Sequence, residues 1–97
     1  MGRPVKLDPA AVLAWRNAHP DWEVEGGALV KRFAFEDFAA ALAFVVRVGC
    51  GAEKRDHHPD VELTWGKVRL LWTTHDAGGL TQLDLDSAEA SDRASRG

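Results

Sequence analysis

Residues 36–72, EDFAAALAFVVRVGCGAEKRDHHPDVELTWGKVRLLW, contain a change of hydrophobic period that decides the fold. In the first half of this stretch, Phe38, Leu42 and Val45 recur at spacings of four and three residues, the period of one helix face. In the second half, apolar and polar residues alternate on both sides of Gly66-Lys67, the pattern of two strands joined by a tight turn. The stretch therefore predicts a mostly buried helix followed by a β-hairpin.

The chain before this stretch predicts the same two kinds of element in the same order. Asp8-Pro9 opens a helix, because an Asp side chain can cap backbone N–H groups and Pro fits the first helical position. The helix ends at His19-Pro20, since the residue before Pro avoids the helical region. Two alternating runs follow, 22–25 and 29–35, and Gly26-Gly27 supplies the turn between them. A helix and a hairpin therefore precede the central helix.

A last helix is expected after the second hairpin and the loop 75–80. Thr81, three residues before Asp84, resembles a capping box at its start. Residues from Ser91 to Gly97 offer almost nothing to bury and are predicted to be disordered. The order α-β-β-α-β-β-α predicts an α+β fold, with one four-stranded antiparallel sheet and helices packed on a single face.

Length and composition indicate a single domain over residues 1–97 that builds its own core. The chain is 45% hydrophobic and 28% charged, as in ordinary globular proteins, and its formal charge of -3 argues against nucleic acid as a partner. The apolar run Phe38–Val46 is far shorter than the roughly 20 residues of a membrane span, and residues 1–20 lack a signal-peptide layout. The lone Cys50 cannot form an internal disulfide, which fits a reducing compartment. We therefore expect a cytoplasmic protein with no membrane association.

Three of the four histidines flank the second hairpin, His57 and His58 before it and His75 after it. Because a hairpin brings its two ends together, these imidazoles are expected to converge at one end of the sheet. Neighbouring side chains of an extended segment point in opposite directions, so one of the adjacent pair should face a pocket and the other flank it. Three carboxylates accompany them in the sequence: Glu53, Asp56 and Asp84. The cluster is a candidate functional site, the alternative being half-exposed surface imidazoles.

Several kinds of chemistry are open to such a cluster. Zinc, iron or copper could use His and carboxylate ligands, but there is no His-x-His on a strand face and no His pair at i, i+4 on a helix. Cys50 is a weak candidate nucleophile, because a thiol within an apolar helix is more often inert packing. The sequence has no Gly-rich phosphate loop. General acid–base catalysis by imidazole, which titrates near neutrality without metal or redox cofactor, is favoured.

The same region resembles the signature of the pterin-4a-carbinolamine dehydratase (4a-hydroxytetrahydrobiopterin dehydratase) family. The residues that carry the resemblance are Glu53-Lys54-Arg55-Asp56-His57-His58-Pro59, Trp65, Lys67-Val68, Thr74-His75, Gly79-Leu80 and Asp84. Upstream, Trp22, Phe33-Ala34-Phe35 and Asp37-Phe38 also resemble the family, so the likeness extends from about Leu13 to Ala88. It is specific, because several uncommon residues stand at set intervals over much of the chain.

The resemblance implies a reaction, an assembly and a set of roles. The reaction is loss of water from 4a-hydroxytetrahydropterin to give quinonoid dihydropterin, with no metal or other cofactor. The assembly is a homodimer or homotetramer, with the sheet extended across the dimer. By position, the resemblance gives catalytic roles to His57, His58 and His75, and substrate-binding roles to Glu53, Asp56 and Asp84. The rival reading is a non-catalytic dimeric adaptor, or a protein-assembly or coactivator module, on the same fold.

Overall fold

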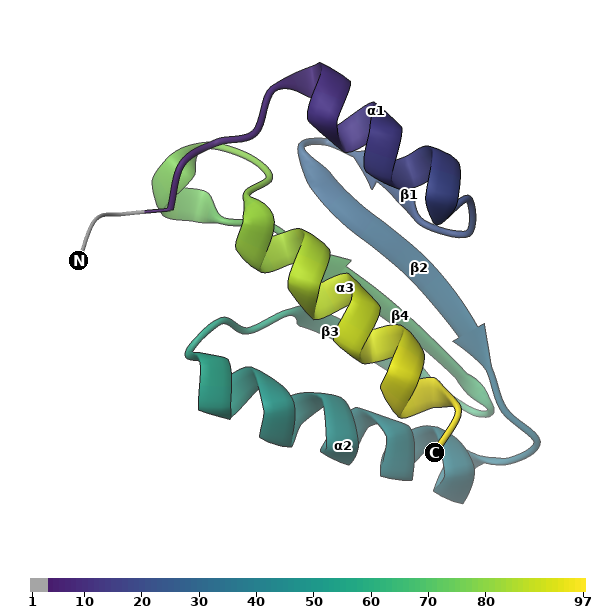
Figure 1. Ribbon diagram of the computed structural model, residues 1–97. Coiled ribbons are helices and arrows are strands. Elements are labelled where there is room, and N and C mark those ends of the chain that lie inside the picture. The colour runs from purple at the N-terminus through teal and green to yellow at the C-terminus, as the bar shows by residue number, and fades with distance from the viewer. Residues whose placement is uncertain (1–3) are drawn as a thin grey trace.

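The structure, a computed structural model, describes residues 4–97 and contains one four-stranded antiparallel sheet with three α-helices (Figure 1). Its elements in chain order are α1 Pro9–Ala18, β1 Glu23–Glu25, β2 Ala28–Ala34, α2 Phe38–Arg55, β3 Asp60–Thr64, β4 Lys67–Trp72, the 3₁₀ helix η1 His75–Ala77, and α3 Gln82–Ser95. The strands lie in the order β1-β2-β4-β3, with antiparallel pairing throughout. The predicted α+β fold is therefore confirmed.

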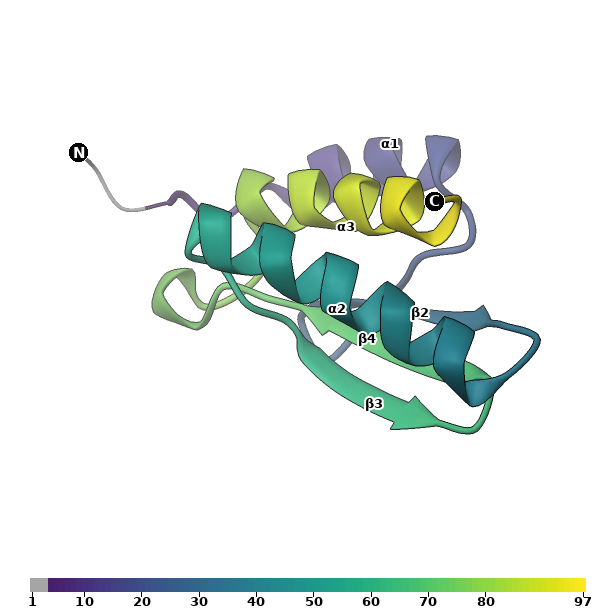
Figure 2. The same ribbon diagram turned by 90° about the horizontal axis from the view of Figure 1, so that it is seen from below.

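All three α-helices cover the same face of the sheet (Figure 2). The core lies between these two layers, where alternate residues of β2 and β4 meet the apolar face of α2. Its largest fully buried apolar side chains are Trp22, Trp72, Phe44, Leu29 and Leu70. Within residues 4–97, every helix is too short or too polar to cross a bilayer.

Helix α2 delivers the chain to the hairpin that carries the histidines. It starts at Asp37, whose carboxylate accepts a 2.8 Å hydrogen bond from the backbone N–H of Ala40. It continues through Gly49 and Gly51 without a break, because the buried side of the helix is filled by neighbouring apolar residues. It ends at Asp56, which adopts the left-handed conformation with φ 51° and ψ 43°. This residue reverses the direction of the chain, so that the residues following it lead into β3 at the edge of the sheet.

The C-terminal segment corrects one sequence prediction. Disorder was expected from Ser91 onward, but α3 continues to Ser95. Ser91 is buried, and its hydroxyl accepts a 3.1 Å hydrogen bond from the indole N–H of Trp72. The next residue, Asp92, accepts a 3.0 Å hydrogen bond from the indole N–H of Trp22. The prediction was wrong because it counted only apolar side chains, whereas these polar residues are held by buried indole donors.

The chain enters β3 and leaves β4 at the same end of the second hairpin, and this end lies near the start of α3 (left in Figure 1). Beyond β4, Thr74 and Gly79 form an isolated antiparallel bridge that closes the loop containing η1. The predicted capping box at the start of α3 is present, and the backbone N–H of Thr81 donates a 2.9 Å hydrogen bond to Asp84. The start of α3 is thereby fixed next to the end of the hairpin.

Candidate active site

One open hollow of about 290 Å³ lies where the chain enters β3 and leaves β4. His57, His58 and His75 all line it, together with Asp56. The remaining lining residues come from the segment after β4: Thr73, Thr74 and Asp76. The three imidazoles thus converge at one end of the sheet, as the hairpin geometry requires.

His57 is the most firmly held of these imidazoles. Its Nε2 lies 2.6 Å from Oδ1 of Asp84, and its ring stacks on Trp72 with centroids 5.6 Å apart and planes 22° from parallel. Its side chain is 10% exposed. Because a carboxylate accepts hydrogen bonds, the Asp84 contact places the imidazole proton on Nε2 of a neutral ring. Nδ1 then carries the lone pair that can take up a proton.

Asp84 differs from its expected role in substrate binding. Its side chain is 0% exposed, so it has no surface with which to touch a ligand in the hollow. Besides His57, it accepts hydrogen bonds from the Thr74 hydroxyl at 2.7 Å and the Thr81 backbone N–H at 2.9 Å. A buried carboxylate requires such partners to offset its lost hydration. Asp84 is therefore a positioning residue that orients His57.

His58 has a different hydrogen-bond partner from that of His57. Its Nε2 lies 2.7 Å from Oε1 of Glu53, which comes from the last turn of α2. Both side chains are exposed. Glu53 is not among the residues that line the hollow and meets it through His58. The pair thus forms one flank of the hollow.

His75 and Asp56 complete the polar lining from two different elements, η1 and the end of α2. His75 is exposed at the start of η1, and in the described part of the chain its side chain makes no hydrogen bond. Asp56 is exposed at the end of α2, where its left-handed backbone turns it toward the hollow. The hollow therefore presents one imidazole fixed by a buried carboxylate and a second that is open to a ligand.

Cys50 lies on α2 outside this hollow. The expectation of inert packing is wrong in detail, because the thiol is exposed.

The alternative of a metal site finds no ligand set in the part of the chain that the structure describes. Residues 4–97 contain no group of three His, Cys, Asp or Glu side chains arranged to hold a metal ion.

The family model described as Pterin 4 alpha carbinolamine dehydratase matches residues 5–94. The chain belongs to this family. A relative from Rhizorhabdus wittichii named "Putative pterin-4-alpha-carbinolamine dehydratase" is 50% identical over 76 residues, covering 76% of this chain and 78% of the relative. A relative of the same name from Chloroflexus aurantiacus is 42% identical over 87 residues, covering 90% of this chain and 94% of the relative.

Solved structures agree with this membership in the pterin dehydratase family. The crystal structure of a transcriptional coactivator/pterin dehydratase from Brucella melitensis superposes with a TM-score of 0.88 at 29% identity, covering 93% of this chain and 98% of that one. A pterin dehydratase-like protein described as a RuBisCO assembly factor of the alpha-carboxysome gives a TM-score of 0.63 at 21% identity, covering 76% and 86%. The second likeness concerns the fold alone.

The sequence alone does not indicate the roles of two residues in the site of this pterin dehydratase family member. Trp72, the last residue of β4, stacks on His57. Thr74 holds Asp84 through its hydroxyl and lies 2.9 Å from the hydroxyl of Thr81. The capping box was the available signal, because it predicts a carboxylate anchored at the start of α3, next to the end of the hairpin.

Proposed function

We propose that this protein removes water from 4a-hydroxytetrahydropterin to give quinonoid dihydropterin. The observation that carries the proposal is the hollow in which His57, oriented by buried Asp84, faces the same space as His75. Membership in the pterin 4 alpha carbinolamine dehydratase family supports the substrate class. A pterin is flat and polar at its edges, which suits an open hollow lined by imidazole, hydroxyl and carboxylate groups.

The dehydration requires two proton transfers, and the hollow offers two imidazoles. The hydroxyl on carbon 4a takes up a proton and leaves as water, while nitrogen 5 gives up its proton. The electron pair of that N–H bond then forms the carbon–nitrogen double bond. Because imidazole titrates near neutrality, His57 and His75 are suited to give one proton and accept the other. This chemistry uses only the chain's own residues.

The decisive experiment adds purified protein to freshly generated 4a-hydroxytetrahydropterin and follows the ultraviolet change of dehydration. We expect acceleration over the uncatalysed reaction, unaltered by prior treatment with a strong chelator. Chelator-sensitive activity that one divalent ion restores would replace the imidazole chemistry with a metal site.

A non-catalytic module is the second candidate, because the solved relative from Brucella melitensis carries a coactivator description beside the dehydratase one. The same assay separates the two functions. Protein that binds pterin without accelerating dehydration would be an adaptor, whereas a dehydratase turns over many equivalents of substrate.

His58 is expected to act mainly in substrate binding. His58→Ala should raise the Michaelis constant about tenfold, because the variant loses roughly one hydrogen bond to a charged or polar ligand. The turnover number should change less. Glu53→Gln, which weakens the contact that orients His58, should shift the same constant in the same direction by less. A steady-state titration of both variants checks this, and an unchanged Michaelis constant with a collapsed turnover number would reassign His58 to proton transfer.

Assembly into a homodimer or homotetramer is also expected. The exposed face of α2 carries an apolar stripe of Phe38, Leu42 and Val46, spaced four residues apart along the helix. The prediction that Phe38 and Leu42 belong to the buried face is therefore wrong, because the residues of α2 that reach the core are Ala41, Phe44, Val48 and Ala52. Such a stripe is stabilised when a second copy covers it. Sedimentation at micromolar concentration should show no stable monomer, and Leu42→Lys should lower the order of assembly. A clean wild-type monomer would contradict this proposal.

A further inference from the structure

The active-site hollow continues into two further hollows. A hollow of about 250 Å³ shares Thr73 and His75 with it. A third hollow, of about 320 Å³, shares Gly27, Gly78 and Gly79 with the second. The three hollows therefore adjoin and form one trough, which runs from the imidazoles to the underside of α1.

The middle of this trough is lined by four glycines together with Thr73 and His75. It lies between the Gly26-Gly27 turn of the first hairpin and the Gly78-Gly79 segment after η1. A Cβ atom built on Gly27 or Gly78 would meet no other atom within 4 Å. At Gly79 a Cβ atom would lie 3.0 Å from Cε of Lys6, so the passage between the active-site hollow and the hollow under α1 runs beside this long, flexible side chain.

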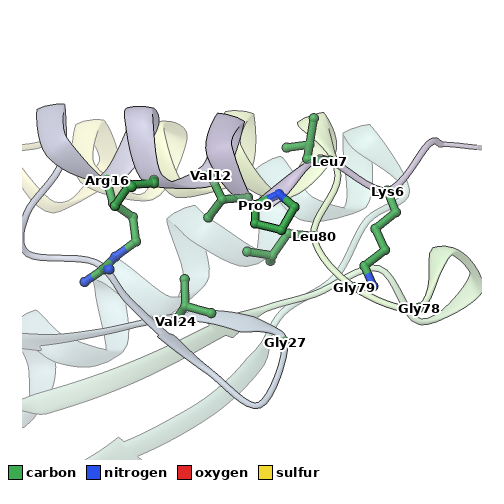
Figure 3. Close-up of a pocket in the computed structure, with 11 residues that line it drawn as sticks. Lys6, Leu7, Pro9, Val12, Arg16, Val24, Gly27, Gly78, Gly79 and Leu80 are labelled. Atoms are coloured by element: carbon green, nitrogen blue, oxygen red, sulfur yellow. The ribbon is translucent and has the colours of Figure 1, made fainter.

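The hollow under α1, which we call the distal pocket, is apolar (Figure 3). Its walls come from α1, from β1 and from the segments just before α1 and α3. The apolar side chains that form these walls are Leu7, Pro9, Val12, Leu13, Val24 and Leu80. Its volume is comparable with that of the active-site hollow, and it suits an organic group better than water.

Two cations border the distal pocket at opposite sides. Figure 3 shows Lys6 beside Gly78 and Gly79, where the pocket meets the rest of the trough, and Arg16 on the far side beyond Val12. Arg16 is fixed in place, because its Nε–H donates a 2.9 Å hydrogen bond to the backbone oxygen of Trp22. Among residues 4–97, neither cation forms an ion pair with a carboxylate. The pocket is thus complementary to a ligand that is apolar along its length and anionic at its end.

We propose that the pterin substrate of this protein carries an extended 6-substituent, flat and apolar along its length and anionic at its end. The inference rests on the proposed dehydratase function. Carbon 6 of a pterin is bonded to nitrogen 5, so its substituent leaves the ring next to the reacting atoms, where His75 joins the first two hollows. The substituent passes over the glycines and enters the distal pocket. A short hydroxylated side chain would contact neither the apolar walls nor Arg16.

The first test compares the binding of stable reduced pterins by anaerobic calorimetry, without turnover. The probes are tetrahydrofolate, whose substituent is an aminobenzoyl group ending in glutamate, and 6-methyltetrahydropterin, which lacks any extension. We expect tetrahydrofolate to bind at least tenfold more tightly. The fragment p-aminobenzoylglutamate should compete with tetrahydrofolate and leave 6-methyltetrahydropterin in place. Equal affinities of the two pterins would overturn the inference.

Variants then locate the preference in the distal pocket. Val24→Trp should fill the pocket and abolish the preference for tetrahydrofolate, with binding of 6-methyltetrahydropterin unchanged. Val61→Trp is the matched control, because Val61 lies on the opposite edge strand and is 40% exposed against 42% for Val24. Lys6→Gln and Arg16→Gln add no bulk but remove a positive charge, and each should weaken the binding of tetrahydrofolate several-fold. A preference that survives all three pocket variants would contradict the assignment.

The two proposals fail separately. If the protein accelerates dehydration but binds both pterins equally, the distal pocket has no part in substrate choice and the dehydratase stands. If it shows the expected binding preference but no acceleration, the trough is a pterin-binding site and the proposed catalysis is wrong.

Discussion

Alanine at His57 or at His75 is expected to lower the turnover number for dehydration by roughly 10²- to 10⁴-fold, the usual contribution of a positioned acid or base. The two imidazoles line one hollow, and each is proposed to carry one of the two proton transfers. Loss of either leaves one transfer to water. Because the uncatalysed dehydration is itself appreciable, the observed loss will be compressed toward that background rate. Stopped-flow measurement under saturating substrate gives the turnover number directly.

The two variants differ in what else they disturb. His75 is exposed, so His75→Ala should leave the fold intact and report the chemistry alone. His57→Ala also removes the stacking on Trp72 and leaves Asp84 short of a donor, so His57→Gln, which keeps an N–H group, is the better companion. His19→Ala is the control, because His19 stacks on Trp15, away from the hollow. Wild-type turnover in both His75→Ala and His57→Gln, with unchanged circular dichroism, would refute the assignment.

The convergence of the histidines was predictable from sequence, because a hairpin fixes the relation between its two ends. Once residues 61–72 are recognised as two paired strands, His57 and His75 must lie at one end of the sheet whatever the rest of the chain does. The separate partners of the adjacent His57 and His58, Asp84 and Glu53, likewise agree with alternation along an extended segment. These features depend on local geometry, which the residue pattern specifies.

The roles of the polar residues in α3 were not predictable, because their partners are distant in the chain. Three indole N–H groups donate hydrogen bonds to this helix, Trp15 to Glu89, Trp22 to Asp92 and Trp72 to Ser91. Without the packing of the helices on the sheet, these residues are simply a polar tail.

Trp65 lies at the turn of the second hairpin, where it is 71% exposed. It is therefore not part of the core of this chain, and a contact of Trp65 with a second copy stays a prediction. Alternation specifies which face of a sheet a residue occupies, but not whether another element covers that face at that position.

Asp84 makes one contact that the sequence predicts and one that it does not. Its capping of α3 follows from its spacing to Thr81, whereas its contact with His57 depends on where α3 begins relative to the hairpin. One carboxylate oxygen stabilises the helix start, and the other orients the imidazole. The substitution that separates these two functions is Asp84→Asn.

Asp84→Asn is expected to lower the turnover number by roughly 10²- to 10⁴-fold, about as much as loss of His57 itself. The amide oxygen must replace the oxygen that accepts from the Thr81 N–H and the Thr74 hydroxyl. The amide nitrogen, which only donates, then faces Nε2 of His57. Nε2 must become the acceptor, so the imidazole proton moves to Nδ1 and the lone pair of Nδ1, the proposed proton acceptor, is lost.

Nitrogen NMR of the imidazole reports this change of tautomer directly, and a merely structural role for Asp84 would not produce it. Urea unfolding should show a loss of about 1–3 kcal/mol, because one buried charge-assisted hydrogen bond is weakened. Asp86→Asn, on the exposed side of the same helix, is the matched control and should change neither rate nor tautomer. An Asp84→Asn variant with wild-type turnover and an unchanged His57 tautomer would show that the buried carboxylate serves the helix alone.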